Sequence, residues 1–264
     1  MFSPKLETPV KTLDIPIGGK LYSAQTLPLI LDFVNITNKL NNNFKDTLSD
    51  DQDGNSTIEI LHITRKVARR INSIHTSSLG LHPIVYFYSQ KGRHKIASFY
   101  ATVIFLMELE ERKKLNEFIK VRAAFESILH DFDFLVQQIQ RHYRSSIGSY
   151  PYIKDYFFKI IDLLNNGVLK DEVINELRND ANFHYLTIHT DDIVVTSKDF
   201  TRERKSAVYI RDAIKSALKC HICNGYIHKN SITIDHIDRK EDGGVGSIDN
   251  GKIAHPYCNS TIKN

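Results

Sequence analysis

The three cysteines of this 264-residue chain all lie after residue 219, and no other feature constrains the fold as strongly. Cys220 and Cys223 are separated by two residues, and His255 and Cys258 repeat that separation further along. This spacing lets a tight turn aim two ligand atoms at one ion, and three sulfurs with one imidazole nitrogen complete a tetrahedral zinc site. An odd cysteine count also disfavours a disulfide framework. The sequence therefore predicts a structural zinc site made by these four residues.

A closed zinc site would stabilise a small module by on the order of 10 kcal/mol, more than so short a segment gains from its own hydrophobic core. The composition changes in the same region, where glycines become frequent between residues 225 and 251. We therefore expect two units. Residues 1–196 are predicted to form a mainly α-helical domain that positions substrate, senses a trigger or oligomerises. Residues 197–264 are predicted to form a basic helix followed by a small α+β zinc module.

Hydrophobic periodicity predicts several helices in the first unit. Their expected ranges are 24–40, 58–74, 95–113, 116–144, 151–166 and 170–179. Two further stretches, 81–89 and 183–195, are rich in aromatic and β-branched residues and are interpreted as extended or strand-like. The numerous aromatic residues are expected to pack in the core.

Composition gives broader limits. The longest apolar run, from Ile96 to Met107, is shorter than the roughly 20 residues that cross a bilayer. The chain does not open with a basic stretch followed by an apolar core, so we expect a cytoplasmic protein without a membrane partner. The formal net charge of +4 is only a weak indication of a polyanionic partner.

The distribution of positive charge is more informative than its total. A predicted helix from about residue 200 to 219, capped by Asp199, leads directly into the zinc segment. Its basic residues suit sequence-independent contacts with nucleic-acid phosphates, although a solvated helix face would have the same composition. The candidates are Arg204, Lys205, Arg211 and Lys215.

Between the two ligand pairs, apolar and polar residues alternate from Ile232 to Ile237, as in a half-buried strand. This strand would end on Asp235 and His236. Because successive side chains of a strand point to opposite sides, one of the two can hold a cation while the other faces a water molecule as a base.

Residues 220–263 resemble the HNH, or ββα-metal, nuclease family. The family pattern is a cysteine pair, an Asp-His strand, a Gly-rich turn, an asparagine, and a short helix that opens with the second ligand pair. The resemblance implies that His236 is the general base, Asp235 a ligand of the catalytic metal, and Asn250 the residue that ties the loop. Asn259 stands where the family has its final histidine. The chain is thus an HNN variant.

An amide oxygen is a harder ligand than an imidazole, so Asn259 favours Mg²⁺ or Mn²⁺ as the catalytic ion. His255 is open to a second interpretation as the catalytic last histidine, but its spacing to Cys258 favours zinc. Lys263 is a candidate contact to a flanking phosphate. His221 and His228 have no place in the pattern and are interpreted as surface or packing residues.

The resemblance implies a metal-dependent endonuclease that cuts nucleic acid, expected to be double-stranded DNA, and leaves a 5′ phosphate. A role in bacterial restriction, phage defence or mobile-element biology is expected. A homodimer, or a protein partner from the same operon that triggers cutting, would fit a helical domain in front of a nuclease. The alternative is a non-catalytic zinc module that binds nucleic acid or protein, which would not account for Asp235, His236, Asn250 and Asn259.

Overall fold

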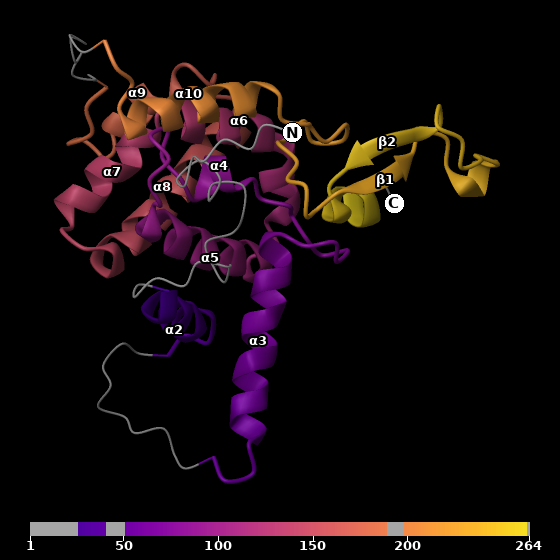
Figure 1. Cartoon of the computed structure of the whole chain (residues 1–264), viewed down its shortest axis with the longest axis horizontal. Helices are drawn as coiled ribbons and strands as arrows, with labels where there is room; N and C mark the ends of the chain where they lie inside the picture. Colours follow the sequence, from indigo (N-terminus) through magenta and orange to yellow (C-terminus); the bar gives the residue numbers. More distant parts are fainter. Residues whose placement is uncertain (1–25, 41–50, 189–197, 263–264) are drawn as a thin grey trace.

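The computed structural model describes residues 26–40, 51–188 and 198–262, and these form a mainly helical body with a small zinc-type module at the C-terminal end (Figure 1). The expected fold class is therefore confirmed. The helices of the body are α2 (Thr26–Thr37), α3 (Asn55–Ile71), α4 (Pro83–Tyr86), α5 (Ile96–Glu111), α6 (Leu115–Asp131), α7 (Asp133–His142), α8 (Ser146–Asn165) and α9 (Val173–Arg178). Among the described residues, no helix is long and apolar enough to cross a bilayer.

The centre of the body is helix α5, which is buried on nearly every side because other helices surround it. Phe105 of α5 lies at the meeting point of three helices. Its ring centroid is 5.6 Å from that of Phe118 in α6 and 5.1 Å from that of Phe158 in α8. Such edge-to-face aromatic pairs stabilise a core beyond their buried area. The expected packing role is confirmed for most aromatic residues of the body, although Tyr152 is exposed.

Helices α2 and α3 are attached to α5 at one edge, and α3 projects from the body in Figure 1. Tyr100 of α5 donates a hydrogen bond to Asp32 of α2 at 2.5 Å. Arg70 near the end of α3 forms a salt bridge with Glu110 of α5 at 3.0 Å. The last turn of α3 is therefore fixed to the body, and the chain leaves it toward the zinc module.

The segment 81–89 is not the predicted strand, because its centre forms the short helix α4. Pro83 occupies the first helical position, where its missing N–H costs nothing, and the His82 Nδ1 accepts a hydrogen bond from the Ile84 N–H at 3.3 Å. Only an isolated bridge between Tyr88 and His94 is extended. The segment is hydrophobic because it is buried, not because it belongs to a sheet.

Three other expectations about elements need correction. The predicted helix 116–144 is two helices, α6 and α7, which meet at Phe132 with φ −116° and ψ 36°. Residues 183–188 form turns and irregular backbone instead of a strand, and 189–195 lie outside the described residues. Helix α8 begins at Ser146 rather than at residue 151, because the Ser145 hydroxyl caps it by accepting from the Gly148 N–H at 2.8 Å.

Helix α10 (Arg202–Lys215) lies against the helical body in Figure 1, and its Glu203 pairs with Arg93 of the body. The module that follows consists of a two-stranded antiparallel sheet of β1 (Thr233–His236) and β2 (Gly251–Ala254), the short 3-10 helix η1 (Lys240–Asp242) and the final π-helix η2 (Cys258–Ile262). Thr201, not Asp199, caps α10, with its hydroxyl accepting from the Arg204 N–H at 3.3 Å. Ile210 and Ile214 of α10 join the same hydrophobic cluster as the body, and so do the three cysteines. The division at residue 196 stays a prediction, and one continuous core crosses it.

Candidate metal and nuclease site

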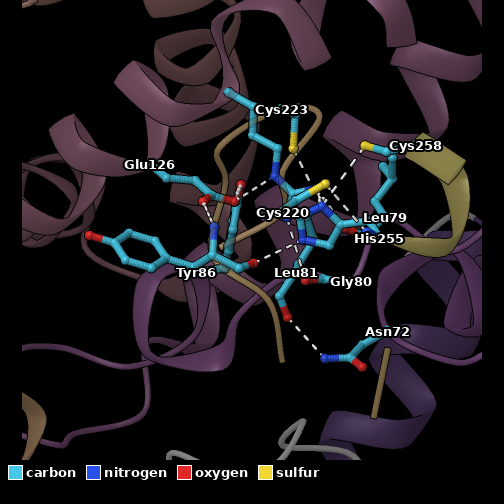
Figure 2. A network of polar contacts seen from close by, with 12 residues as sticks. Asn72, Leu79, Gly80, Leu81, Tyr86, Glu126, Cys220, Cys223, His255 and Cys258 are labelled. Carbon is cyan, nitrogen blue, oxygen red and sulfur yellow. Dashed lines mark hydrogen bonds and ion pairs between the residues drawn. The ribbon is translucent and has the colours of Figure 1, made fainter. Parts of the chain in front are cut away.

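The four predicted zinc ligands lie together in the core. Cys220, Cys223, His255 and Cys258 are all buried, and their ligand atoms lie within 4.8 Å of one another (Figure 2). The His255 Nδ1 is 3.4 Å from the Cys223 sulfur and 3.9 Å from the Cys258 sulfur. Zinc bonds of ordinary length place tetrahedral ligand atoms about 3.5–3.8 Å apart, so the cluster has the size of a zinc site. These four residues form a site that could bind structural zinc.

The imidazole of His255 is oriented for this role. Its Nε2 lies 3.0 Å from the carbonyl oxygen of Tyr226, which can only accept, so Nε2 carries the proton. The lone pair of Nδ1 is thereby left to face the sulfurs, as in zinc sites whose histidines donate to a backbone carbonyl. Burial, followed by the Arg122 charge, lowers the pKa of His255, which favours the neutral form that binds metal.

The local backbone explains why the first ligand pair converges. The Cys220 carbonyl accepts from the Asn224 N–H at 2.8 Å, and the Cys220 N–H donates to Gly225 at 2.9 Å. Asn224 closes this turn in the left-handed region, with φ 56°. The next position must be glycine, because a Cβ there would lie 2.7 Å from the Arg122 Nε. The turn therefore fits closely against helix α6.

A buried ion pair of α6 borders the zinc cluster, and sequence reasoning did not find it. The Arg122 Nε donates to the Glu126 Oε1 at 2.7 Å, and the Arg122 Nη1 donates to the Leu79 carbonyl at 2.6 Å. The same Nη1 lies 3.3 Å from the His255 Nδ1. Three thiolates around a zinc ion carry a net negative charge, so the guanidinium is electrostatically suited to this place.

The carboxylate of Glu126 connects this network to the helical body and to the module (Figure 2). It accepts from the Tyr86 hydroxyl at 2.9 Å and from the Tyr226 N–H at 2.7 Å, directly after the cysteine turn. More hydrogen bonds join the body to the module at Asn72–His228, Ser73–Ser231, Ser78–Ser231, Ser78–Tyr257, Thr76–Ser260 and Asn116–Tyr257. His228 is thus a buried packing residue. The module is held by polar contacts as well as by the shared core.

The predicted catalytic pair ends strand β1. Asp235 is buried with 4% of its surface exposed, and His236 is half-buried. In the antiparallel register His236 pairs with Gly251, which has no side chain to cover the imidazole. A Cβ on Gly251 would meet the Ile234 side chain at 3.0 Å, so Ile234 and His236 share one face of the sheet. Asp235 belongs to the other face, as strand alternation requires.

Asn259 approaches the face on which Asp235 lies. Its Nδ2 donates to the Thr233 Oγ1 at 3.3 Å and to the Ile234 carbonyl at 3.2 Å. Thr233 precedes Asp235 by two residues and therefore shares its face. With the amide nitrogen bound to β1, the oxygen is the atom left to act as an acceptor or a metal ligand. A carboxylate and an amide oxygen on one face are hard donors that suit Mg²⁺ or Mn²⁺.

Asn250 closes the glycine-rich loop between the strands. Its Oδ1 accepts from the Asp238 N–H at 2.7 Å, and its Nδ2 donates to the carbonyls of Asp238 at 3.1 Å and Val245 at 2.8 Å. The Ile237 N–H also donates to its backbone carbonyl at 2.9 Å. Gly244 is required in this loop, because a Cβ would lie 2.0 Å from the Asp238 carbonyl. The residues that directly follow His236 are thus fixed in place.

One histidine near this site was not predicted. The Nε2 of His221 lies 2.6 Å from the Asp235 Oδ2, although His221 was interpreted as a surface or packing residue. The position of His221 between Cys220 and Cys223 did not predict its contact with Asp235, because that contact depends on how the cysteine turn packs against β1.

The basic residues of α10 are on the surface. Lys205, Arg211 and Lys215 are exposed and Arg204 is half-buried. Residues 204, 211 and 215 follow one another at seven- and four-residue steps and so form one stripe, whereas Lys205 lies off it. Arg211 forms a salt bridge with its neighbour Asp212 at 2.9 Å. Lys263 lies outside the described residues.

Comparison with known proteins assigns the segment that carries these features. A family model described as HNH endonuclease matches residues 220–264, which include the four zinc ligands, both strands and η2. The match does not extend into the helical body. No curated protein and no solved structure matches the chain. The segment therefore supports a nuclease-type, metal-binding function.

Proposed function

We propose that this chain, whose residues 220–264 match the HNH endonuclease family, is a metal-dependent endonuclease that hydrolyses phosphodiester bonds of double-stranded DNA. The observation that carries the proposal is the way Asn250 fixes the loop directly after the Asp235–His236 pair, with three side-chain hydrogen bonds to Asp238 and Val245. A module that only bound nucleic acid would not need that tether beside an acid–imidazole pair.

The proposed roles follow from the chemistry of each side chain. The carboxylate of Asp235 and the amide oxygen of Asn259 would hold the catalytic ion, for which Mg²⁺ and Mn²⁺ fit the hard donor set. When bound, that ion neutralises charge that develops on the phosphate and on the leaving 3′ oxygen. His236, at the strand end and opposite a glycine, accepts the proton of the attacking water as general base.

Two other groups of residues have supporting roles. With zinc bound, Cys220, Cys223, His255 and Cys258 would hold the end of β2 and the start of η2 against the cysteine turn, and so would fix the position of Asn259 relative to β1. The basic stripe of α10, with Lys205 beside it, contacts phosphates along the duplex without reading sequence. Lys263 is proposed to contact a phosphate next to the scissile one.

The biological role that we propose is bacterial restriction or phage defence. The helical body would then make a homodimer that cuts both strands, or receive a protein partner encoded beside it. Purification of the chain with its neighbouring gene products, followed by size measurement, tests which of these assemblies forms.

A cleavage experiment tests the proposed activity and its substrate. Zinc-loaded full-length protein is incubated with supercoiled plasmid or with structured RNA, in the presence of Mg²⁺, Mn²⁺ or a chelator. We expect nicked and then linear DNA with a 5′ phosphate, only when a divalent ion is added. If the protein binds DNA yet never cuts with any metal, including in the presence of co-purified partners, the chain is a binding module and the proposal fails.

A further inference from the structure

The contact between His221 and Asp235 links two metal sites that the proposed function treats as separate. His221 follows the zinc ligand Cys220, and its backbone N–H donates to the Ile253 carbonyl of β2 at 3.1 Å. Its backbone is therefore held between the cysteine turn and the sheet. From this fixed position its Nε2 reaches the Asp235 Oδ2 at 2.6 Å. A carboxylate oxygen can only accept, so the imidazole donates.

The burial of Asp235 makes this contact significant. The side chain of Asp235 is 5% exposed and that of His221 is 26% exposed. Burying a carboxylate is costly unless hydrogen bonds or charges compensate it, so a donor at this position determines which rotamer the acid adopts. A histidine–acid pair with both side chains in solvent would have little effect. Here the acid is buried although His221 reaches the surface, so the pair fixes a side chain whose orientation matters for binding an ion.

We propose that His221 is a positioning residue for the catalytic ion. It donates to the Asp235 Oδ2, so that the carboxylate is oriented toward the ion before the ion binds. Because His221 lies in the cysteine turn, the position of that turn determines the position of the carboxylate. Removing a residue that hydrogen-bonds to a metal ligand typically lowers metal affinity or activity ten- to hundredfold. The inference rests on the proposed function, because it takes Asp235 as a ligand of that ion.

The test measures Mn²⁺ binding to the zinc-loaded full-length protein, without nucleic acid, by titration calorimetry and electron paramagnetic resonance. His221→Ala is compared with His221→Gln, whose side-chain amide can still donate to Asp235. His62→Ala, on the exposed surface of α3, is the matched control. Zinc content is measured for every variant.

We expect His221→Ala to keep its zinc and to bind Mn²⁺ about ten- to hundredfold more weakly than wild type. His221→Gln should recover most of that loss, and His62→Ala should bind as wild type does. Loss of zinc from His221→Ala would make the contact part of the fold alone and overturn the inference. Unchanged Mn²⁺ affinity would also overturn it, and so would a nitrogen coupling to Mn²⁺ that disappears in His221→Ala, since that would make His221 a direct ligand.

The same data separate this inference from the proposed function. If wild type binds Mn²⁺ and Asp235→Ala abolishes binding, the ion site exists, and only the role of His221 is in question. If wild type does not bind Mn²⁺ at all, both the ion site and the positioning role fail together.

Discussion

The guanidinium of Arg122 and the carboxylate of Glu126 form a 2.7 Å salt bridge on successive turns of α6, and neither side chain is exposed. Arg122 donates a hydrogen bond to the Leu79 carbonyl in the segment that follows α3, and Glu126 accepts one from the Tyr226 N–H just after the cysteine turn. The pair therefore stands where the helical body and the module meet. Breaking a buried ion pair by removing one partner leaves an uncompensated charge in the core, which is far more harmful than losing a surface pair.

We expect Glu126→Gln to lower the free energy of unfolding by about 3–5 kcal/mol, because the variant keeps the shape of the side chain but leaves the Arg122 charge buried without its partner. Glu111→Gln is the control, because it breaks the exposed pair with Lys39 and should cost at most about 1 kcal/mol. Urea unfolding in zinc-containing buffer measures both. Equal stability of the two variants would show that the buried pair does not join the regions energetically.

Removal of zinc should destabilise the whole chain and not the module alone, because the three cysteines belong to the same hydrophobic cluster as the body. We expect a chelator, or the Cys258→Ser variant, to lower the melting temperature of the helical signal in circular dichroism as a single transition. The zinc content of the variant is measured in parallel. A helical transition that is unaffected by zinc loss would mean that the body folds independently.

Stability should also depend on the protonation of His94, whose ring packs beside Tyr88 and whose buried Nε2 has no hydrogen-bond partner among the described residues. Burial, followed by the Lys95 charge, lowers the pKa of His94 from 6.5 to about 4. The unfolded chain therefore takes up this proton at a higher pH than the folded chain. The stability due to neutral His94 is fully present above pH 6.5 and is lost as the pH falls from 6.5 toward 4.

The variant His94→Phe tests this dependence, since it keeps an aromatic ring and removes the titrating group. The unfolding free energy of wild type, relative to that of the variant, should decrease by up to about 1.4 kcal/mol for each pH unit in that window. Taking the difference cancels the pH dependence of the zinc ligands, which both proteins share. A difference that does not change with pH would contradict the assignment.

Asn250→Asp should uncouple the loop from the nuclease site while leaving the zinc site intact. The substitution replaces an amide that donates to two carbonyls with a carboxylate that repels them, at a cost of about 1–3 kcal/mol for each unsatisfied group. We expect the amides of Ile237 and Asp238 to exchange hydrogen faster and plasmid cleavage to fall sharply. Asn230→Asp, at an exposed turn, is the control. If hydrogen exchange and plasmid cleavage are both unchanged, Asn250 does not hold the loop for catalysis.

Local patterns predicted much of this structure. The clustering of Cys220, Cys223, His255 and Cys258 followed from their spacing, and the strand that ends in Asp235 and His236 followed from alternation. Both signals lie within a few neighbouring residues. Helix α5 was also predicted closely, because an apolar run of that length between polar ends is too long for a strand and is typical of a buried helix.

The contacts that could not be predicted are those that depend on docking. Nothing near Arg122 in the sequence indicates that it meets His255, and nothing near His221 indicates that it meets Asp235. The strand expected at residues 81–89 was wrong for a similar reason, since burial in the body, not sheet pairing, explains why the segment around α4 is apolar. Tertiary packing overrides local propensity at such places.

In the proposed function, His236 is the general base of a metal-dependent nuclease. The most direct test of this role is the rate at which zinc-loaded wild type and His236→Ala nick the same supercoiled plasmid in Mg²⁺ or Mn²⁺. We expect the variant to keep its zinc and its fold and to lose about 10²–10⁴-fold in rate. Nicking by His236→Ala at the wild-type rate would contradict this role.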